Sequence, residues 1–122
     1  MDKQEMFNRA WNGLKSQGFE RSMRIYKGVA YGGEPGGLRC AYAGDNGMRC
    51  AWGWVDLSLD EKITGGVFTL HRKQIGLAAD LSSQDLEFAS NLQAIHDESL
   101  IPSTMEKSLR DLASQHGLTI PE

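Results

Sequence analysis

The chain has 122 residues, of which 40% are apolar and 24% charged, and its formal net charge is −3. These values are typical of one soluble globular domain, which we place over residues 1–122. No apolar run approaches the roughly 18 to 20 residues that cross a bilayer, and the N-terminus does not resemble a signal peptide. We therefore expect a cytoplasmic protein with reduced thiols and no membrane partner.

Charge is divided unevenly along the chain. Residues 1–55 carry eight Lys or Arg and five Asp or Glu, whereas residues 56–122 carry five and eleven. There is no clustered basic patch, so direct binding of nucleic acid is not expected. The acidic second half is suited to a basic protein surface, although a solvated helical face is the simpler interpretation.

The first predicted element is an N-terminal helix. Asp2 and Glu5 have the spacing of a helix cap, and Gly18 is a suitable stop. Between them, apolar residues recur at helical spacing on one face: Phe7, Ala10, Trp11 and Leu14.

The middle of the chain favours β-structure. Residues 23–31 are rich in strand-forming residues and are an option for a third strand, and "GGEPGG" (32–37) reads as a loop. Gly36 and Gly37 in this loop would let backbone approach a ligand closely. The loop lacks the lysine and spacing of a phosphate-binding loop, so phosphate is not favoured.

A hairpin is predicted around residues 38–55, where "LRCAYA" and "MRCAWGWV" flank "GDNG". The large apolar residues of both segments have even numbers, and residues directly opposite each other in a hairpin point to the same face. These residues therefore share a face only if the numbers of each facing pair add up to an even number. A three-residue loop with Gly47 in the left-handed conformation satisfies this condition. It places Tyr42 opposite Cys50 and Cys40 opposite Trp52, with the thiols as diagonal neighbours on the core face.

The opposite face of this hairpin carries Arg39 and Arg49, which we expect to face solvent or a partner. Trp54 and Trp11 lie nearest the ends of their predicted elements and are the aromatic residues most suited to surface positions. Whether the cluster of Tyr42, Trp52 and Trp54 is core or surface stays open at this stage, with core favoured by its apolar face.

The second half reads as helices. Three pairs have the spacing of helix caps: Ser58 with Glu61, Ser82 with Asp85, and Ser103 with Glu106. Two apolar stripes follow the last two starts: Phe88, Leu92 and Ile95, then Met105, Leu109 and Leu112. The stretch "ITGGVFTLHRKQIGL" is ambiguous between strand and helix. The predicted class is α+β, with a small antiparallel sheet packed against about four helices.

Cys40, Cys50 and His96 are the candidates for chemistry. Nine residues separate the two thiols, which is not the spacing of a zinc site, so we expect neither metal nor cofactor. We assign no catalytic residue. The alternative is a small cysteine- or metal-dependent enzyme that uses these three residues, with Asp97 orienting His96. The simpler reading of His96 is a buried imidazole whose tautomer Asp97 fixes.

Four motifs in order along the chain resemble a group of short, mostly uncharacterised phage- and prophage-encoded proteins. They are a "Q-x-x-F" helix at Gln4 and Phe7, the hairpin "RCAYAGDNGMRCAWG", the helix end "LQAIHD", and the final "LRDLASQHGL". The chain departs from the group after the hairpin, where it has "WVDLSLDEK", and in extra residues around "YKGVAYGGEPGG".

The resemblance implies a phage or prophage accessory protein that acts in the bacterial host cytoplasm. Such proteins often act by binding, so we expect inhibition of a host or defence-system protein, as anti-CRISPR proteins do. A homodimer is also compatible with this reading. The binding residues proposed from the sequence are Arg39, Arg49, Trp54, Gly36, Gly37, His96 and Asp97.

Overall fold

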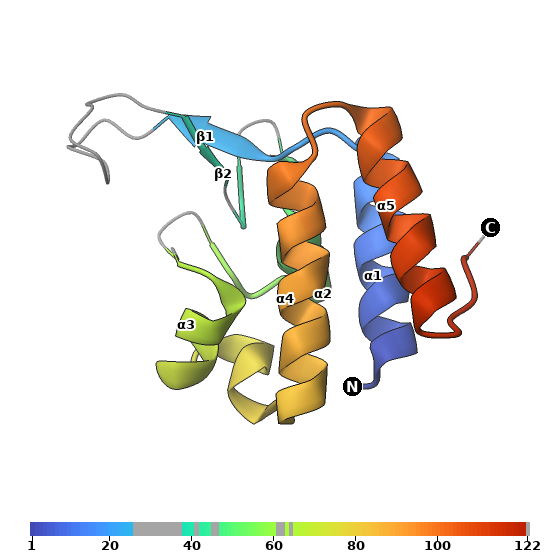
Figure 1. Ribbon diagram of the computed structural model, residues 1–122. Coiled ribbons are helices and arrows are strands. Elements are labelled where there is room, and N and C mark those ends of the chain that lie inside the picture. Colours follow the sequence, from blue (N-terminus) through green and yellow to red (C-terminus); the bar gives the residue numbers. More distant parts are fainter. Residues whose placement is uncertain (26–37, 41, 45–46, 61–62, 64, 122) are drawn as a thin grey trace.

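Helices form most of the computed structural model, which describes residues 1–25, 38–40, 42–44, 47–60, 63 and 65–121 (Figure 1). Three of them are long: α1, α4 and α5. The elements in chain order are α1 (Lys3–Ser16), β1 (Met23–Ile25), β2 (Leu38–Cys40), α2 (Ala51–Val55), α3 (Val67–Arg72), the 3-10 helix η2 (Gly76–Asp80), α4 (Ser83–Glu98) and α5 (Pro102–Gln115). None of the helices in these ranges is long and apolar enough to span a membrane.

Helix α1 forms as its sequence predicts. The Asp2 side chain accepts a hydrogen bond from the Glu5 N–H, and the predicted apolar stripe is buried. At the other end Gly18 adopts a φ of 69°, and the Phe19 N–H donates to the Leu14 carbonyl at 2.8 Å. This backbone pattern closes the helix and turns the chain toward Arg21.

Helix α4 also begins at its predicted cap, since the Ser82 side chain accepts from the Asp85 N–H. The other two predicted caps are wrong. Helix α5 begins at Pro102 with Ile101 as its N-cap, which makes no side-chain hydrogen bond. No described helix begins at Ser58, whose hydroxyl and N–H both donate to Asp56; Glu61 lies outside the described residues.

The α+β prediction is wrong, because the second half of the predicted hairpin is a helix. Residues 51–55 form α2, and Cys50 precedes it as the N-cap, with its Sγ accepting from the Gly53 N–H. All of these residues except Trp54 are buried, so the segment shows neither strand nor helix periodicity in its sequence. The described β-structure consists of two three-residue strands, with Met23 opposite Cys40 and Ile25 opposite Leu38.

Gly47 adopts the predicted left-handed conformation even though the described residues do not form the predicted hairpin. Gly47 has a φ of 72°, and the Gly44 N–H donates to the Met48 carbonyl at 2.8 Å. Asp45 and Asn46 lie outside the described residues. The predicted pairings of Tyr42 with Cys50 and of Cys40 with Trp52 are wrong, because the chain enters α2 directly after the turn.

The core lies where α1, α2 and α4 meet. Helix α4 contacts α1, α2, α3 and α5, and the largest fully buried side chains include Trp11, Trp52, Phe7 and Phe88. The expected surface position of Trp11 is therefore wrong, because its ring lies on the buried face of α1. Helix α2 packs tightly on α1: a Cβ at Gly13 would lie 2.1 Å from Cγ of Trp54. This packing brings the start of α2 against the C-terminal half of α4, where the polar side chains collect.

Candidate functional site

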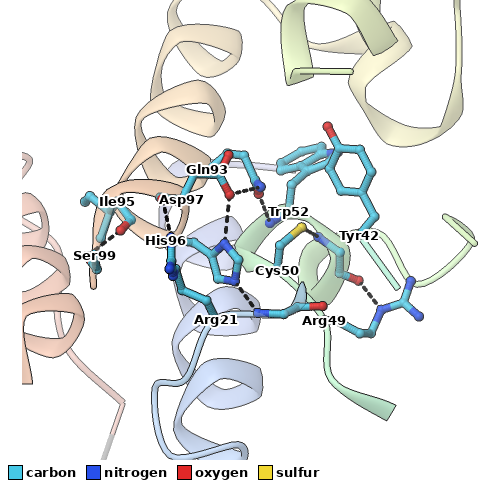
Figure 2. Close-up of polar contacts among 12 residues, drawn as sticks. Arg21, Tyr42, Arg49, Cys50, Trp52, Gln93, Ile95, His96, Asp97 and Ser99 are labelled. Atoms are coloured by element: carbon cyan, nitrogen blue, oxygen red, sulfur yellow. Dashed lines mark hydrogen bonds and ion pairs between the residues drawn. The ribbon is translucent and has the colours of Figure 1, made fainter. Parts of the chain in front are cut away.

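His96 is at the centre of a buried polar cluster on α4 (Figure 2). Its side chain is fully buried, and its Nε2 lies 2.9 Å from the backbone nitrogen of Ser22. Its Nδ1 lies 2.9 Å from Oδ1 of Asp97. Because the Ser22 N–H is a donor, Nε2 acts as the acceptor, so the ring proton sits on Nδ1 and is donated to Asp97.

Gln93, one turn before Asp97 on α4, joins this cluster to α2. Its Oε1 accepts the Trp52 N–H at 2.9 Å, and its Nε2 donates to Oδ1 of Asp97 at 3.0 Å. The Trp52 N–H belongs to the first turn of α2, where it has no intrahelical partner. Gln93, a residue of α4, therefore caps the N-terminus of α2.

Cys50 is fully buried beside Gln93, and this burial raises the pKa of its thiol to about 12, although the hydrogen bond from the Gly53 N–H acts in the opposite direction. A thiol with this pKa is protonated at neutral pH and is a poor nucleophile. Both nitrogens of His96 are already bonded, so His96 has no free position to take the Cys50 proton. The arrangement does not favour a Cys50–His96 nucleophile.

A metal site is not assembled either, within the part of the chain that the structure describes. These residues contain no group of three or more His, Cys, Asp or Glu side chains that could hold a metal ion. The side chain of Cys40 lies outside the described part, so no contact between the two thiols is assigned.

Arg49 is half-buried and bonded within the fold, rather than on the outer face of a hairpin as predicted. Its Nε donates to the Gly53 carbonyl at 2.7 Å, and one Nη donates to the Leu59 carbonyl at 2.5 Å. The Arg49 N–H donates to Oε1 of Gln17 at 3.0 Å, and the Arg49 carbonyl accepts from Nε2 of Gln17 at 2.8 Å. The side chain thus holds the end of α2 and the following loop together.

Trp54 is partly buried against α1, and its Nε1 donates to Oε1 of Gln17 at 3.1 Å. Tyr42 and Trp52 are buried in the core. The Tyr42 hydroxyl donates to the Gly65 carbonyl, and burial raises the pKa of this phenol. The aromatic cluster is therefore core with a partly exposed end at Trp54.

Of the remaining residues proposed from the sequence, Gly36 and Gly37 lie outside the described residues, as does the side chain of Arg39. The side chains of His96 and Asp97 are hydrogen-bonded to each other, and their other hydrogen bonds, to Ser22 and Gln93, stabilise the fold. Gln17 and Gln93 are also part of these polar contacts, although their sequence surroundings do not predict it. Nothing local distinguishes them, since Gln93 and Trp52 are 41 residues apart.

The surface offers a different candidate, at the connection between α4 and α5 (Figure 1). Leu100 is 80% exposed and Ile101 is 55% exposed. They border a pocket of about 270 Å³ between the end of α1 and this connection. Its lining consists of Phe19, Glu20, Arg21, Ser99, Leu100, Ile101 and Pro102. We call this surface the α4–α5 pocket.

The lining of the α4–α5 pocket contains one acidic and one basic residue, Glu20 and Arg21. Asp97 and Glu98 occupy the adjacent last turn of α4 but do not line the pocket, and the Asp97 carboxylate is bonded to Gln93 and His96. The carbonyl end of a helix is already electronegative, so acids in the last turn reinforce the negative potential. Arg21 is the cation in the lining, and its Nη1 donates to the Asp97 carbonyl at 3.1 Å.

No protein-family model matches the chain, and neither a curated protein nor a solved structure matches it.

Proposed function

We propose that this protein is a non-enzymatic binding protein of phage or prophage type, which inhibits a host or defence-system protein through the α4–α5 pocket. The observation that carries the choice of surface is the exposure of Leu100 and Ile101, at 80% and 55%, beside a pocket. Adjacent exposed apolar residues next to a recess are typical of protein contact sites. The phage context rests on the sequence motifs.

The identity of residue 101 supports the α4–α5 pocket as the contact surface. Ile101 is the N-cap of α5, and it leaves the first turn of this helix without a side-chain acceptor. Isoleucine is among the poorest N-caps, whereas serine or aspartate would stabilise the helix by about 0.5–2 kcal/mol. Residues that oppose local stability are expected where a protein acts on something else.

The polar cluster supports binding rather than catalysis. Its reactive groups are occupied: the Cys50 thiol caps α2, and the imidazole of His96 bonds to Ser22 and Asp97. A general base needs a free lone pair directed at the group it deprotonates, and both nitrogens of His96 are already bonded to other groups. The cluster instead makes a rigid support for the end of α4, one turn from the exposed residues.

The test is phage plating on bacterial strains that each carry one defence system, CRISPR systems included. We expect the expressed protein to raise the efficiency of plaquing on one of these strains. The double variant Leu100→Ser/Ile101→Ser should lose this effect while remaining folded, because it changes only exposed side chains and adds no charge. The matched control is Phe68→Ser, which removes an exposed apolar residue of α3, away from the pocket (Figure 1).

Two results would contradict the proposal in different ways. If plaquing rises on none of the strains, the protein is not an inhibitor of these systems. If the effect survives in the double variant but disappears in Phe68→Ser, the contact surface is wrong. Loss of the effect in a folded Cys50→Ser variant would instead favour the cysteine-dependent enzyme.

A further inference from the structure

We infer that the hydrogen bond between Ser22 and His96 is an acid-sensitive switch: when the imidazole takes up a second proton, the segment after α1 separates from the end of α4. This inference concerns the conformation of the α4–α5 pocket, and it does not depend on which molecule binds there. It rests on the direction of the Ser22 bond, on the burial of both partners, and on the groups around the ring.

The direction of the Ser22 bond makes it depend on protonation. The Ser22 N–H can only donate, so Nε2 of His96, at 2.9 Å, accepts through its lone pair. The ring proton is already on Nδ1, which donates to Asp97. A second proton therefore binds at Nε2, where two N–H groups then point at each other. The bond cannot persist in this state unless the ring or the backbone moves.

Burial of both partners turns this conflict into a force that separates the two segments. Ser22 and His96 are fully buried, so neither N–H has water as a replacement partner while the segments stay together. Leaving buried donors unpaired costs free energy, and separation, which admits water to both, relieves that cost. Histidine changes its charge between about pH 5 and 8, so the conflict arises in mild acid.

The other two histidines show that this arrangement is specific to His96. Nδ1 of His71 lies 2.8 Å from the Ala78 carbonyl, which is an acceptor, so a further proton on that ring leaves the bond in place. His116 is exposed at the end of α5, where its imidazole can ionise in water. Protonation of either ring therefore does not place a donor against a donor.

One charged group favours the protonated ring, and another opposes it. The Asp97 carboxylate attracts an imidazolium, but its side chain is 39% exposed and is therefore screened by water, and it already accepts from the neutral ring. Arg21, in the segment after α1, binds the Asp97 carbonyl at 3.1 Å, and its guanidinium would repel a second positive charge. Glu20, beside Arg21, is exposed and lines the pocket.

The remaining titratable groups nearby do not supply a negative charge in acid. Burial raises the pKa of Cys50, before α2, and that of Tyr42, so both side chains are neutral at low pH. The Arg49 side chain is directed at backbone carbonyls around the end of α2. On α3 and α5, Arg72 donates to Thr69, Glu106 pairs with Arg110, and Lys107 pairs with Asp111.

Loss of the Ser22 bond would change the α4–α5 pocket. Residues 19–21, directly before Ser22, and residues 99–102, directly after α4, make up its lining. When the two segments separate, these two groups of lining residues move apart. The surface is therefore assembled at neutral pH and opens in acid.

The experiment follows the full chain, labelled with nitrogen-15, by NMR from about pH 7.5 to about pH 5. It records the ring nitrogens of His96 and the protection of the Ser22 amide against hydrogen exchange, corrected for the intrinsic rate at each pH. We expect Nε2 to gain a proton while Ser22 protection falls by up to about tenfold per pH unit. Amides of residues 19–22 and 99–101 should shift with the same midpoint, whereas those of residues 6–14 in α1 should keep their protection.

The variant His96→Gln should keep the Ser22 amide protected at every pH, because the glutamine oxygen accepts the N–H and does not titrate. His116→Gln is the matched control: it removes an exposed imidazole and should leave the pH dependence unchanged. If the His96 variant does not fold, the titration of the parent protein decides the question alone. An imidazole of His96 that stays neutral at pH 5, or a Ser22 amide whose protection does not change, would overturn the inference.

Discussion

The backbone N–H of Ser22 donates to Nε2 of His96 at 2.9 Å, across 74 residues of chain. Ser22 and His96 are both fully buried, so neither group has water as an alternative partner. Arg21 makes a parallel contact to the carbonyl of Asp97 at 3.1 Å. Together these bonds attach the segment after α1 to the end of α4 (Figure 2). Arg21, in the first of these segments, and Ser99, directly after α4, both line the α4–α5 pocket.

Replacing His96 by alanine should therefore destabilise the protein by about 2–5 kcal/mol. The substitution leaves a buried N–H without an acceptor and opens a cavity, and both effects cost free energy. Urea unfolding followed by circular dichroism measures the change. Asn91→Ala, an exposed change on the same helix, should stay within about 0.5 kcal/mol of the parent protein. A loss at His96 no larger than at Asn91 would mean that the Ser22 bond does not hold the fold together.

Replacing Gln93 by glutamate introduces a charge with little change in side-chain shape. In Gln93→Glu the carboxylate still accepts the Trp52 N–H, but it faces Oδ1 of Asp97, to which the native amide donates at 3.0 Å. Like charges at this distance raise the pKa of the introduced carboxyl. The variant should be destabilised at neutral pH and should recover relative to the parent as pH falls through this raised pKa. Unfolding free energies at several pH values give the comparison, and a pH-independent difference would contradict the predicted repulsion.

These long-range contacts mark the boundary of what the sequence could predict. The caps at Asp2 and Ser82 and the buried stripes of α1, α4 and α5 follow from residues within one or two turns, so they could be read directly. Helix α2 could not, because its short length and nearly complete burial hide its periodicity. Its start depends on Gln93, which is distant in sequence. The left-handed conformation of Gly47 was predictable, but the structure that follows it was not.

Cys50 should be inert toward alkylation while the protein is folded. Burial raises the pKa of this thiol from 9.0 to about 12, so the reactive thiolate is scarce at neutral pH. Iodoacetamide labelling, with the modified cysteine identified by peptide mass spectrometry, should show Cys50 reacting only after urea is added. Rapid labelling of Cys50 in the native protein would contradict its assigned burial.

The same thiol makes folding stability depend on pH in the alkaline range. The folded-state pKa lies above the unfolded value, so the unfolded chain loses the proton first. The contribution is intact below about pH 9 and is lost as pH rises toward 12, at up to about 1.4 kcal/mol per pH unit. Unfolding free energies from pH 8 to 11 should fall more steeply for the parent than for Cys50→Ala. Parallel curves would show that Cys50 does not contribute this dependence.

Ile101 should be a position where stability and binding change in opposite directions. In Ile101→Ser the hydroxyl can accept an N–H in the first turn of α5, which has no side-chain cap in the native protein. We expect a gain of about 1 kcal/mol in unfolding free energy, within the range measured for N-caps. Ile101→Ala removes the same apolar surface without supplying an acceptor, so it should not produce this gain. Because both variants remove the exposed isoleucine, both should weaken binding at the α4–α5 pocket, and only the serine variant should unfold at a higher temperature than the parent. A serine variant no more stable than the alanine variant would show that the N-terminus of α5 does not need a cap.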